Sequence, residues 1–453
     1  MSTEQSNNLS ASRRRFVKQS TWLAGGLLAA PLLSKANYFS GADDTIKVAL
    51  IGCGGRGTGA AMQALLSKQN VKLVAMADAF RDNLDRSYKR LTAPETAKES
   101  GINLSERIDV PEERKFSGFD AYQKAIALAD VVILATPPGF RPIHFEEAIK
   151  QNKHVFMEKP VATDPAGIRR VLAAAEEAKK KNLKVGVGLQ RRHQPSYHEA
   201  IQKIRDGAIG DLVTLRAYWN GGHPAKQPFP RGDLSELEYQ VRNWYFFSWL
   251  SGDHICEQHV HNLDVCNWVK DGHPTEAQGL GGRQVRTGKE YGNIFDHHAV
   301  EFTYADGTKM YSQCRQIPGC ANKVAESAHG TRGVANLNAT HAEILIGGKR
   351  TWRASGGEQG YSNNAYQAEH DALFDAIRHD KPYNEAEYAA HSTMTAILGR
   401  MATYSGQIVS WDEAIKSNHS MTTDAERWDA PAPITPNSDG RYAVAVPGVT
   451  KVV

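Results

Sequence analysis

Four glycines in the stretch Gly52-Cys53-Gly54-Gly55-Arg56-Gly57 have the spacing of a phosphate-binding turn. The apolar run before them, residues 46–51, is typical of a buried strand, and residues 60–66 continue with helical spacing. In the context strand, G-x-G-x-x-G, helix, the glycines let the backbone approach a diphosphate, whose charge lies at the helix N-terminus. Contact with a dinucleotide is therefore predicted for Gly52, Gly54, Gly55, Arg56 and Gly57. A glycine-rich turn without a ligand is the structural alternative.

A carboxylate follows at the distance that dinucleotide-binding folds require. The second predicted strand, residues 71–77, ends at Asp78, which is 21 residues beyond Gly57. There a carboxylate can accept hydrogen bonds from the adenosine ribose and would repel a 2′-phosphate. NAD is therefore predicted in preference to NADP. Arg81, three residues further on, is the one feature that speaks for NADP, and it is counted among the predicted cofactor contacts.

Two more apolar runs, residues 129–135 and 154–156, predict strands of the same parallel sheet, because helical segments separate them. The first ends at Thr136-Pro137 and the second at Glu158-Lys159-Pro160. Ligands of doubly wound sheets lie across the carboxyl ends of the strands, so Thr136 and Pro137 should border the nicotinamide. His144, on the following helix, either faces the same cleft or caps it.

A chain of 453 residues is too long for one ordinary core. Residues 45–190 are predicted to form an α/β Rossmann domain with a doubly wound parallel sheet. Residues 191–425 lack this alternation and predict an α+β domain with a largely antiparallel sheet, because strand patterns recur at 212–219, 276–280, 298–304 and 309–313. Residues 426–453, rich in Pro, Gly and Ala, are predicted to be a wrapping arm or disordered.

Glu257 and His261 have the i, i+4 spacing that makes two side chains neighbours on one face of a helix. A carboxylate beside an imidazole holds its tautomer and stabilises the cation formed when the ring takes a proton. Lys159, near a bound nicotinamide, could stabilise a developing oxyanion and, if desolvated, share in the proton transfer. This chemistry suits the oxidation of an alcohol.

The glycine turn, Asp78, Thr136-Pro137-Pro138, Glu158-Lys159-Pro160 and residues 252–268 occur in an order that resembles the glucose-fructose oxidoreductase, inositol dehydrogenase and MocA (Gfo/Idh/MocA) family. The likeness covers residues 45–410. It implies that Lys159, Glu257 and His261 act together on a sugar or polyol hydroxyl, and that a cis bond before Pro160 turns Lys159 into the cleft. Glu158 and Lys159 are both predicted to contact the cofactor. Glu257 is a departure, because the family has aspartate there. The aromatic run 242–245 is most similar to that of an exported subgroup.

Further residues are predicted to contact the substrate: Arg192, Trp244, Tyr245 and Asp264, together with Lys159 and His261. The aromatic pair could equally belong to the core, and Asp264 could cap its helix locally. No metal is predicted, because His254, His259, His261 and Cys256 spread over more than one helical face and the family resemblance implies none.

The N-terminal residues 1–36 are predicted to be a signal peptide. They combine Ser12-Arg13-Arg14-Arg15-Phe16, which resembles the twin-arginine signal, with an apolar run at 22–33 and a small-x-small site at 34–36. They hold five basic residues and one acidic residue, which accounts for the whole formal charge of +4. Nucleic acid and a stable membrane anchor after cleavage are therefore not predicted as partners, and export to the periplasm is. An uncleaved anchor is the alternative.

Five cysteines do not form an obvious disulfide framework, and only Cys314 and Cys320 are close enough in sequence to close a loop around Pro318-Gly319. Whether they pair stays open.

Three functions remain after these considerations. The first is an NAD-dependent dehydrogenase of a sugar, glycoside or polyol. The second is a redox-neutral glycoside hydrolase or epimerase that keeps its NAD bound and passes through a keto-sugar, which suits an exported enzyme because free NAD is scarce outside the cytoplasm. The third is a non-catalytic sugar-binding module. A homo-oligomer is expected in each case.

Overall fold

The computed structural model describes residues 44–96, 103–354, 364–421 and 427–453, and these are the residues discussed below. Contacts separate residues 1–34 from residues 35–453 as two units. The predicted signal peptide, residues 1–36, lies outside the described residues. The five cysteines lie within them and are unpaired, with Cys314 buried and Cys320 exposed, so the disulfide considered above does not form.

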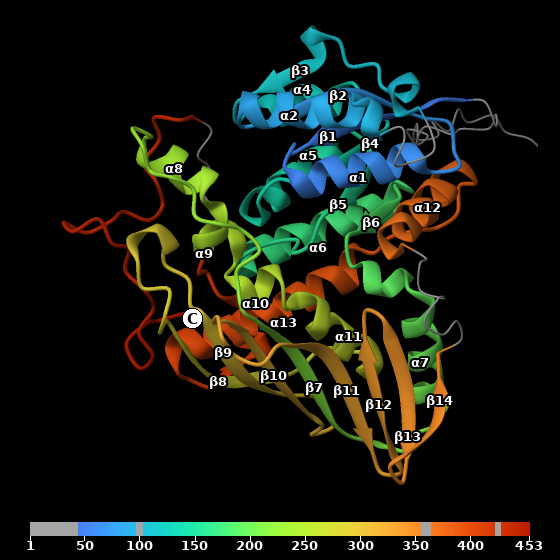
Figure 1. The fold of residues 1–453 in the computed structure, drawn as a ribbon, viewed down its shortest axis with the longest axis vertical. Coiled ribbons are helices and arrows are strands. Elements are labelled where there is room, and N and C mark those ends of the chain that lie inside the picture. The colour runs from blue at the N-terminus through green and yellow to red at the C-terminus, as the bar shows by residue number, and fades with distance from the viewer. Residues whose placement is uncertain (1–43, 97–102, 355–363, 422–426) are drawn as a thin grey trace, which may run out of the picture. The chain divides into compact units, whose positions relative to one another are not determined.

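The first domain contains a six-stranded parallel sheet with the order β3-β2-β1-β4-β5-β6 (Figure 1). The order reverses between β1 and β4, which is the switch point at which doubly wound folds bind ligands. The predicted Rossmann fold is therefore confirmed. The strands are β1 (Ile46–Ile51), β2 (Val71–Asp78), β3 (Lys115–Ser117), β4 (Val131–Leu134), β5 (His154–Met157) and β6 (Val185–Val187). The strand β3 was not predicted.

Helices cover both faces of this sheet, which explains why its central strands read as continuous apolar runs. They are α1 (Gly55–Leu66), α2 (Arg81–Thr92), α4 (Ala121–Ala127), α5 (Arg141–Lys150) and α6 (Pro165–Lys180). The first helix approaches β1 so closely that a Cβ on Gly57 would lie 1.9 Å from the carbonyl oxygen of Gly52. Only glycine fits at that position.

The first domain receives one more helix from late in the chain. Helix α12 (Ala365–Arg378) returns to it and places Leu373, Phe374 and Ile377 in the same core cluster as β1 and α1 (Figure 1). Beyond this helix, Asn384 forms an isolated bridge with Val185 of β6. Residues far apart in the sequence therefore complete the core of the first domain, while the predicted boundary near residue 190 stays a prediction.

The second domain is built on a nine-stranded sheet with the order β14-β13-β12-β11-β7-β10-β9-β8-β15. All neighbours are antiparallel except β7 and β10, which are parallel. The strands are β7 (Leu212–Gly221), β8 (Glu276–Gly282), β9 (His297–Thr303), β10 (Lys309–Gln316), β11 (Lys323–Gly330), β12 (Gly333–Asn338), β13 (His341–Ile346), β14 (Lys349–Arg353) and β15 (Val409–Ser410). The predicted α+β fold is confirmed, although only β7 to β10 were predicted.

Helices cover one face of this sheet. Helix α11 (Val260–Lys270) packs on β7 and β11, and α13 (Ala386–Ser405) packs on β8 and β9. Burial alternates along β10, as expected of a sheet with one covered face. The remaining helices are α7 (Pro195–Arg205), α8 (Glu236–Arg242), α9 (Ser248–Ser251), α10 (His254–Glu257) and α14 (Trp411–Lys416).

The last described residues, 427–453, form the predicted wrapping arm. The Tyr442 hydroxyl donates to Glu236 Oε1 over 2.7 Å, and Gly448 N–H donates to the Ser405 carbonyl over 2.7 Å. At the start of the arm, Trp428 stacks on Phe80 of the first domain with ring centroids 5.0 Å apart. The arm therefore contacts both domains.

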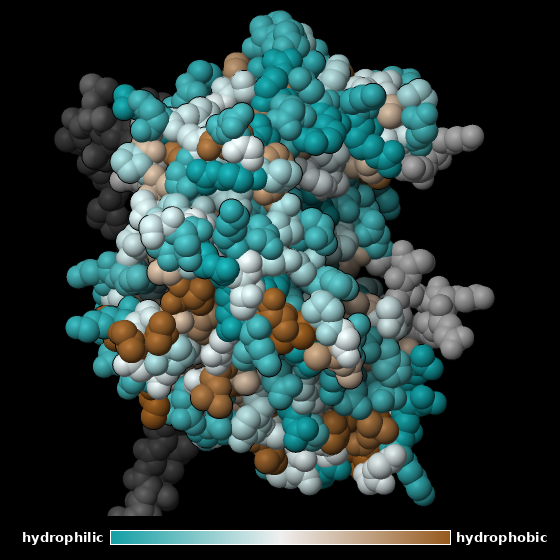
Figure 2. All heavy atoms as spheres, turned by 60° about the vertical axis from the view of Figure 1, so that its left-hand side comes forward, coloured by the Kyte–Doolittle hydropathy of each residue, from teal (hydrophilic) through white to brown (hydrophobic). Residues whose placement is uncertain are grey.

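Among the described residues, no helix combines the length and the apolarity needed to cross a bilayer. Figure 2 shows hydrophobic side chains gathered in the lower half of one face, at the height of the nine-stranded sheet in Figure 1. Large hydrophobic residues are exposed on this sheet, among them Leu280 and Tyr311. The expected homo-oligomer stays a prediction.

If α12 completes the core of the first domain, Leu373→Ala should lower the free energy of unfolding by about 2–5 kcal/mol, because Leu373 is fully buried. The same substitution at Leu280, which is 80% exposed, should change it by less than about 0.5 kcal/mol. Urea unfolding followed by fluorescence measures both. Equal losses in the two variants would show that α12 does not belong to this core.

Candidate active site

A cavity of about 950 Å³ opens at the switch point of the parallel sheet. Its walls include the predicted glycine turn from Gly52 to Gly57 together with Asp78, Thr136, Pro137, His144 and Trp244. A Cβ added to Gly54 or Gly55 would meet no atom within 4 Å, and the N-terminus of α1 has neither a side-chain cap nor an acidic residue in its first turn. Unsatisfied N–H groups beside open space suit an anionic diphosphate, so these residues fit NAD.

Asp78 stands at the end of β2 and is held by the turn itself. Its Oδ2 accepts a hydrogen bond from Cys53 N–H over 2.6 Å, and its Oδ1 accepts one from Phe80 N–H over 2.9 Å. Burial raises the pKa of the Asp78 carboxyl, and these two donors oppose that shift. The carboxylate is thus fixed at the edge of the cavity where an adenosine ribose is expected.

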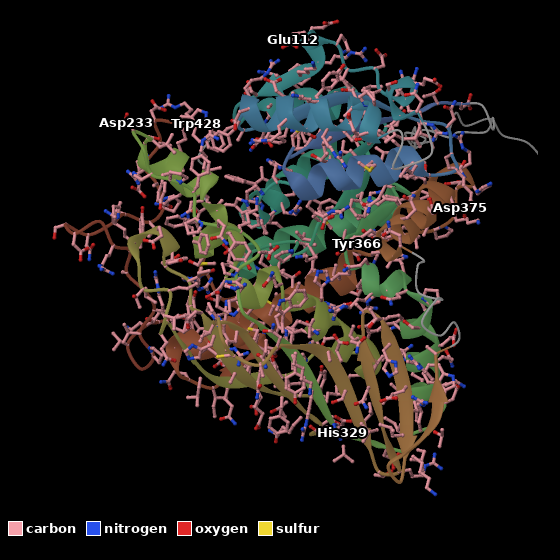
Figure 3. The ribbon with its side chains drawn as sticks, in the orientation of Figure 1. Glu112, Asp233, His329, Tyr366, Asp375 and Trp428 are labelled. Carbon is pink, nitrogen blue, oxygen red and sulfur yellow. The ribbon has the colours of Figure 1, made fainter. Side chains whose placement is uncertain are left out.

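Arg81 does not line this cavity, contrary to prediction. Its Nε donates to Asp85 over 2.9 Å, and a second nitrogen pairs with Glu112, which lies at the outer edge of the domain (Figure 3). Because its guanidinium is engaged there, Arg81 is not placed to bind a 2′-phosphate. Asp78 alone sets the preference at this position, and it favours NAD.

His144 lines the cavity and is bonded within it. Its Nδ1 lies 3.1 Å from the Thr136 hydroxyl, and its ring stacks on Tyr122 with centroids 4.1 Å apart. Burial, followed by the charge of Arg141, lowers the pKa of His144 to about 3. The ring is therefore neutral and forms part of the cofactor wall, as Thr136 does.

Glu158 lies outside the cavity, so its predicted direct contact with the cofactor is not what the structure shows. It is buried and pairs with Arg56 of the glycine turn, with Nε and Oε1 2.8 Å apart. The Arg56 guanidinium also lies 4.9 Å from the ring centre of Tyr366, which Figure 3 labels. Glu158 therefore positions the glycine turn through Arg56.

Lys159 follows β5, whose neighbour β4 leads into the cavity wall at Thr136. The peptide bond between Lys159 and Pro160 is cis, as expected. The Lys159 Nζ donates to the backbone carbonyl of Glu257 and lies 3.2 Å from its Oε1. The predicted residues Lys159 and Glu257 are thus in direct contact, although they are 98 positions apart in the sequence.

Glu257 and His261 do not share one helix, which corrects the interpretation of their spacing. Helix α10 ends at Glu257, and α11 begins at Val260. Glu257 bonds to Lys159, while the His261 ring stacks on Trp219 of β7 with centroids 6.0 Å apart. Burial and then the charge of Lys159 hold the pKa of His261 well below its usual value, and its Nδ1 has no hydrogen-bond partner in the described residues.

The pair predicted to bind substrate, Arg192 and Asp264, is instead an internal ion pair. Two guanidinium nitrogens of Arg192 reach Asp264 over 3.0 and 2.8 Å, and Ser392 donates to the same carboxylate over 2.8 Å. The guanidinium also lies 4.0 Å from the ring centre of Tyr388. These contacts give Arg192 and Asp264 a structural role beside the site.

A second buried ion pair was missed. Arg191 pairs with Glu326 of β11, and Glu326 also accepts from Tyr197 over 3.0 Å and from Asn262. Asn262 is adjacent to His261, so this network fixes the helix turn that carries the imidazole. The only signal in the sequence was the basic run Arg191-Arg192-His193, because the strand that carries Glu326 was not predicted.

The two aromatic residues predicted to contact the substrate, Trp244 and Tyr245, lie in different surroundings. Trp244 lines the cofactor cavity. Tyr245 is 1% exposed, and its hydroxyl accepts from Gln316 Nε2 over 2.7 Å. Gln316 also donates to Gln258, the residue after Glu257, over 2.7 Å. Tyr245 therefore supports the site from the core and does not face the substrate.

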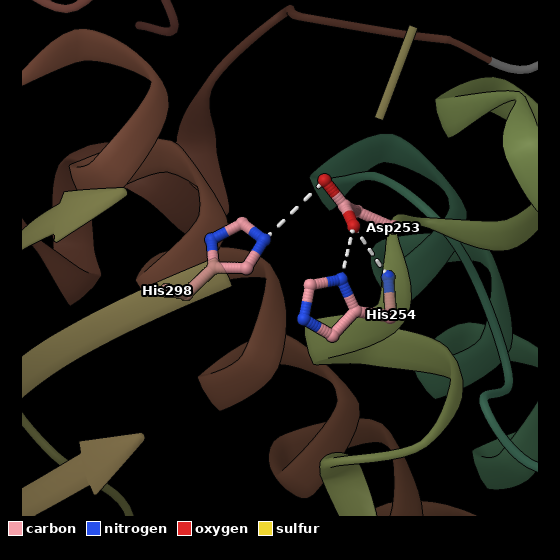
Figure 4. Close-up of side chains that lie close together, drawn as sticks. All are labelled: Asp253, His254 and His298. Carbon is pink, nitrogen blue, oxygen red and sulfur yellow. Dashed lines mark hydrogen bonds and ion pairs between the residues drawn. The ribbon is translucent and has the colours of Figure 1, made fainter. Parts of the chain in front are cut away.

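Asp253, His254 and His298 form a buried cluster close enough to hold a metal ion (Figure 4). However, Asp253 Oδ1 lies 2.9 Å from His254 Nδ1, and Oδ2 accepts from Phe295 N–H over 2.8 Å and from the Tyr404 hydroxyl over 2.6 Å. Both carboxylate oxygens are thus engaged. We assign the cluster a structural role, which is to fix the start of α10.

Comparison of the sequence with known protein families agrees with this geometry. A family model described as oxidoreductase family, NAD-binding Rossmann fold matches residues 46–188, and one described as GFO/IDH/MocA C-terminal domain matches residues 197–336. The chain belongs to the GFO/IDH/MocA oxidoreductase family. Its first domain is accordingly the NAD-binding domain of this family.

Individual relatives of the GFO/IDH/MocA family are distant. Inositol 2-dehydrogenase of Rubrobacter xylanophilus is 25% identical over 299 residues, which are 66% of this chain and 72% of the relative. 2,7-Anhydro-N-acetylneuraminate hydratase of Escherichia coli is 26% identical over 213 residues, which are 46% of this chain and 50% of the relative. The structure of an aldose-aldose oxidoreductase from Caulobacter crescentus matches with a TM-score of 0.62 at 19% identity, over 81% of this chain and 100% of that one.

The cluster of Asp253, His254 and His298 predicts that the free energy of unfolding depends on pH. Burial lowers the pKa of His298 to about 4, so this ring is neutral in the folded protein where an unfolded chain would bind a proton. Its contribution to stability is present above about pH 6.5 and is lost as the pH falls toward 4. Replacing His298 by Gln should make the free energy of unfolding vary less steeply with pH in this range, by up to about 1.4 kcal/mol per pH unit.

Urea unfolding at pH 7, 6 and 5 measures these slopes. Identical slopes in the wild type and in His298→Gln would show that His298 is not a buried neutral ring.

Proposed function

We propose that the protein is an NAD-dependent oxidoreductase that acts on a hydroxyl group of a sugar, glycoside or polyol. The observation that supports this most directly is the contact of Lys159 with Glu257 just after β5, beside the strand that leads into the cofactor cavity. His261 lies close enough for the charge of Lys159 to contribute to the lowering of its pKa. The relative named inositol 2-dehydrogenase supports a polyol or sugar as the substrate.

Oxidation of an alcohol removes a hydride from carbon and a proton from oxygen. Bound NAD supplies the hydride acceptor. His261 can take the proton, because its ring is neutral. Lys159 can stabilise the oxygen as it loses that proton, since an ammonium in a largely desolvated site attracts a developing oxyanion strongly.

Glu257 has a different task from the one its spacing suggested. Its carboxylate lies against Lys159, which fixes the direction of the lysine ammonium. We propose that Glu257 positions Lys159 and that the buried network around Glu326 orients His261. The longer side chain of glutamate, compared with aspartate, suits the reach from the end of α10 to Lys159.

Incubation with NAD and a panel of sugars and polyols should therefore produce NADH absorbance in excess over enzyme. Lys159→Met and His261→Asn should each lower kcat/KM by at least about 100-fold, because each removes one of the groups that handle the proton and the oxyanion. Matched substitutions at Lys349, exposed on β14, and at His329, low on the nine-stranded sheet in Figure 3, should leave kcat/KM unchanged. Activity retained in both site variants would contradict the proposal.

A second function uses the same first step without net oxidation. The relative named a hydratase supports it, because addition of water leaves the oxidation state of the substrate unchanged. Oxidation of a ring hydroxyl to a ketone acidifies the neighbouring C–H, a base eliminates the glycosidic group, water adds, and the ketone is reduced back with the hydride removed first. The outcome is hydrolysis or epimerisation, and we propose export through residues 1–36 as its setting.

Cleavage of a glycoside by dialysed enzyme without added NAD is expected under this second function. The product should carry solvent deuterium at the carbon next to the oxidised one when the reaction runs in deuterium oxide. Mass spectrometry of the product tests this, and cleavage without deuterium incorporation would contradict a keto-sugar intermediate.

A further inference from the structure

The cofactor cavity has a wall that the first domain does not supply. The segment between β7 and α8, with the residues that follow it, contributes Lys226, Phe229, Val241, Arg242 and Trp244 to the lining. The glycine turn and Asp78 lie on the part of the wall that belongs to the first domain. A dinucleotide in this cavity would therefore lie between two domains.

Contacts with the first domain hold this segment in place. The Arg242 guanidinium lies 3.8 Å from the ring centre of Phe80 and 3.2 Å from Asp82 Oδ1. Phe229 N–H donates to Asn243 Oδ1 over 2.8 Å, which ties the segment to the end of α8. Trp428, from the C-terminal arm, stacks on Phe80 and lies near α8 in Figure 3.

Lys226 is the cation of this segment that has no anionic partner. It forms no hydrogen bond or ion pair with any residue in the described part of the chain, and its nearest defined contact is the Trp244 ring, whose centre is 5.5 Å from Nζ. By contrast, Arg56, Arg170 and Arg242 of the same cavity each pair with a carboxylate.

The surroundings of Lys226 place it between the two ends of the cavity. Lys226 is exposed to solvent, but the surrounding protein desolvates its ammonium enough to lower its pKa, and the carboxylates that oppose this shift are Glu257, at the catalytic end, and Asp78, at the ribose end. The diphosphate of NAD joins the nicotinamide and adenosine halves, and the N-terminus of α1 offers it backbone N–H groups.

We propose that Lys226 binds the diphosphate of NAD from the second domain, across the cavity from the glycine turn. This inference rests on NAD being the cofactor of the proposed function. The ammonium supplies a positive charge that no carboxylate pairs with in the described residues, whereas Arg56 of the glycine turn is paired with Glu158. The contact of Lys226 would hold the segment between β7 and α8 against the cofactor. Lys226 is thus a positioning residue for the cofactor, and it slows the loss of NAD.

Binding of two fragments of NAD tests this assignment. Calorimetric titration with ADP-ribose, which contains the diphosphate, should show an affinity about 10- to 100-fold lower in Lys226→Met than in the wild-type full-length chain, as expected for loss of a charge-assisted contact. Adenosine, which lacks phosphate, should bind both proteins equally. Lys226→Arg should restore the affinity for ADP-ribose, and Lys349→Met on β14 should behave as the wild type.

Salt provides a second readout, because it screens an attraction between charges. The affinity of the wild type for ADP-ribose should fall more steeply with sodium chloride than that of Lys226→Met. Equal ADP-ribose affinities in the two proteins would overturn the proposal, and so would a variant that raises only the KM of the sugar, since Lys226 would then bind the substrate. A wild-type chain that binds neither fragment would contradict the proposed function itself.

Discussion

The contact of Lys159 with Glu257 connects the two domains at the point where the chemistry is expected. Lys159 is fixed by the end of β5, and Glu257 is fixed by α10, so the distance between them depends on how α10 begins. Asp253 determines that start: it has a positive φ of 69°, is completely buried, and receives hydrogen bonds from Phe295 and Tyr404. The buried carboxylate of Asp253 thus sets the position of the partly exposed carboxylate of Glu257, because the short helix α10 between them leaves little freedom.

The features that could be predicted from the sequence are those with local causes. The glycine turn, Asp78 and the central strands of the parallel sheet depend on tight turns and continuous apolar runs, which a short window shows. Strand β11 pairs with the distant β7, and β15 with the distant β8, which a short window does not show. The partly exposed residues of β11 also give a weaker apolar pattern, so Glu326 was missed. The spacing of Glu257 and His261 looks the same whether or not the helix is interrupted at Gln258 and His259, so the sequence alone did not show the break.

Residue type predicts what a side chain can bind, and the fold decides what it does bind. Arg192 and Arg81 have the chemistry of anion-binding residues, but carboxylates within the protein already occupy their guanidinium groups. Lys226 has no surrounding motif and received no role from the sequence, because its importance arises only where a segment of the second domain reaches the cofactor cavity. For charged side chains, the presence or absence of an internal partner therefore separates structural residues from those available to a ligand.

Helix α12 makes the cofactor domain discontinuous along the chain. Its core needs Leu373 and Phe374, which are synthesised long after the glycine turn, so a ribosome must release most of the polypeptide before this domain can close. The two domains consequently mature together, and the dinucleotide meets a nearly complete protein. The same arrangement restricts evolution and engineering by recombination. A single crossover near residue 190 would separate α12 from its sheet, so exchange of the substrate-binding part between relatives requires two junctions, one on each side of the inserted domain.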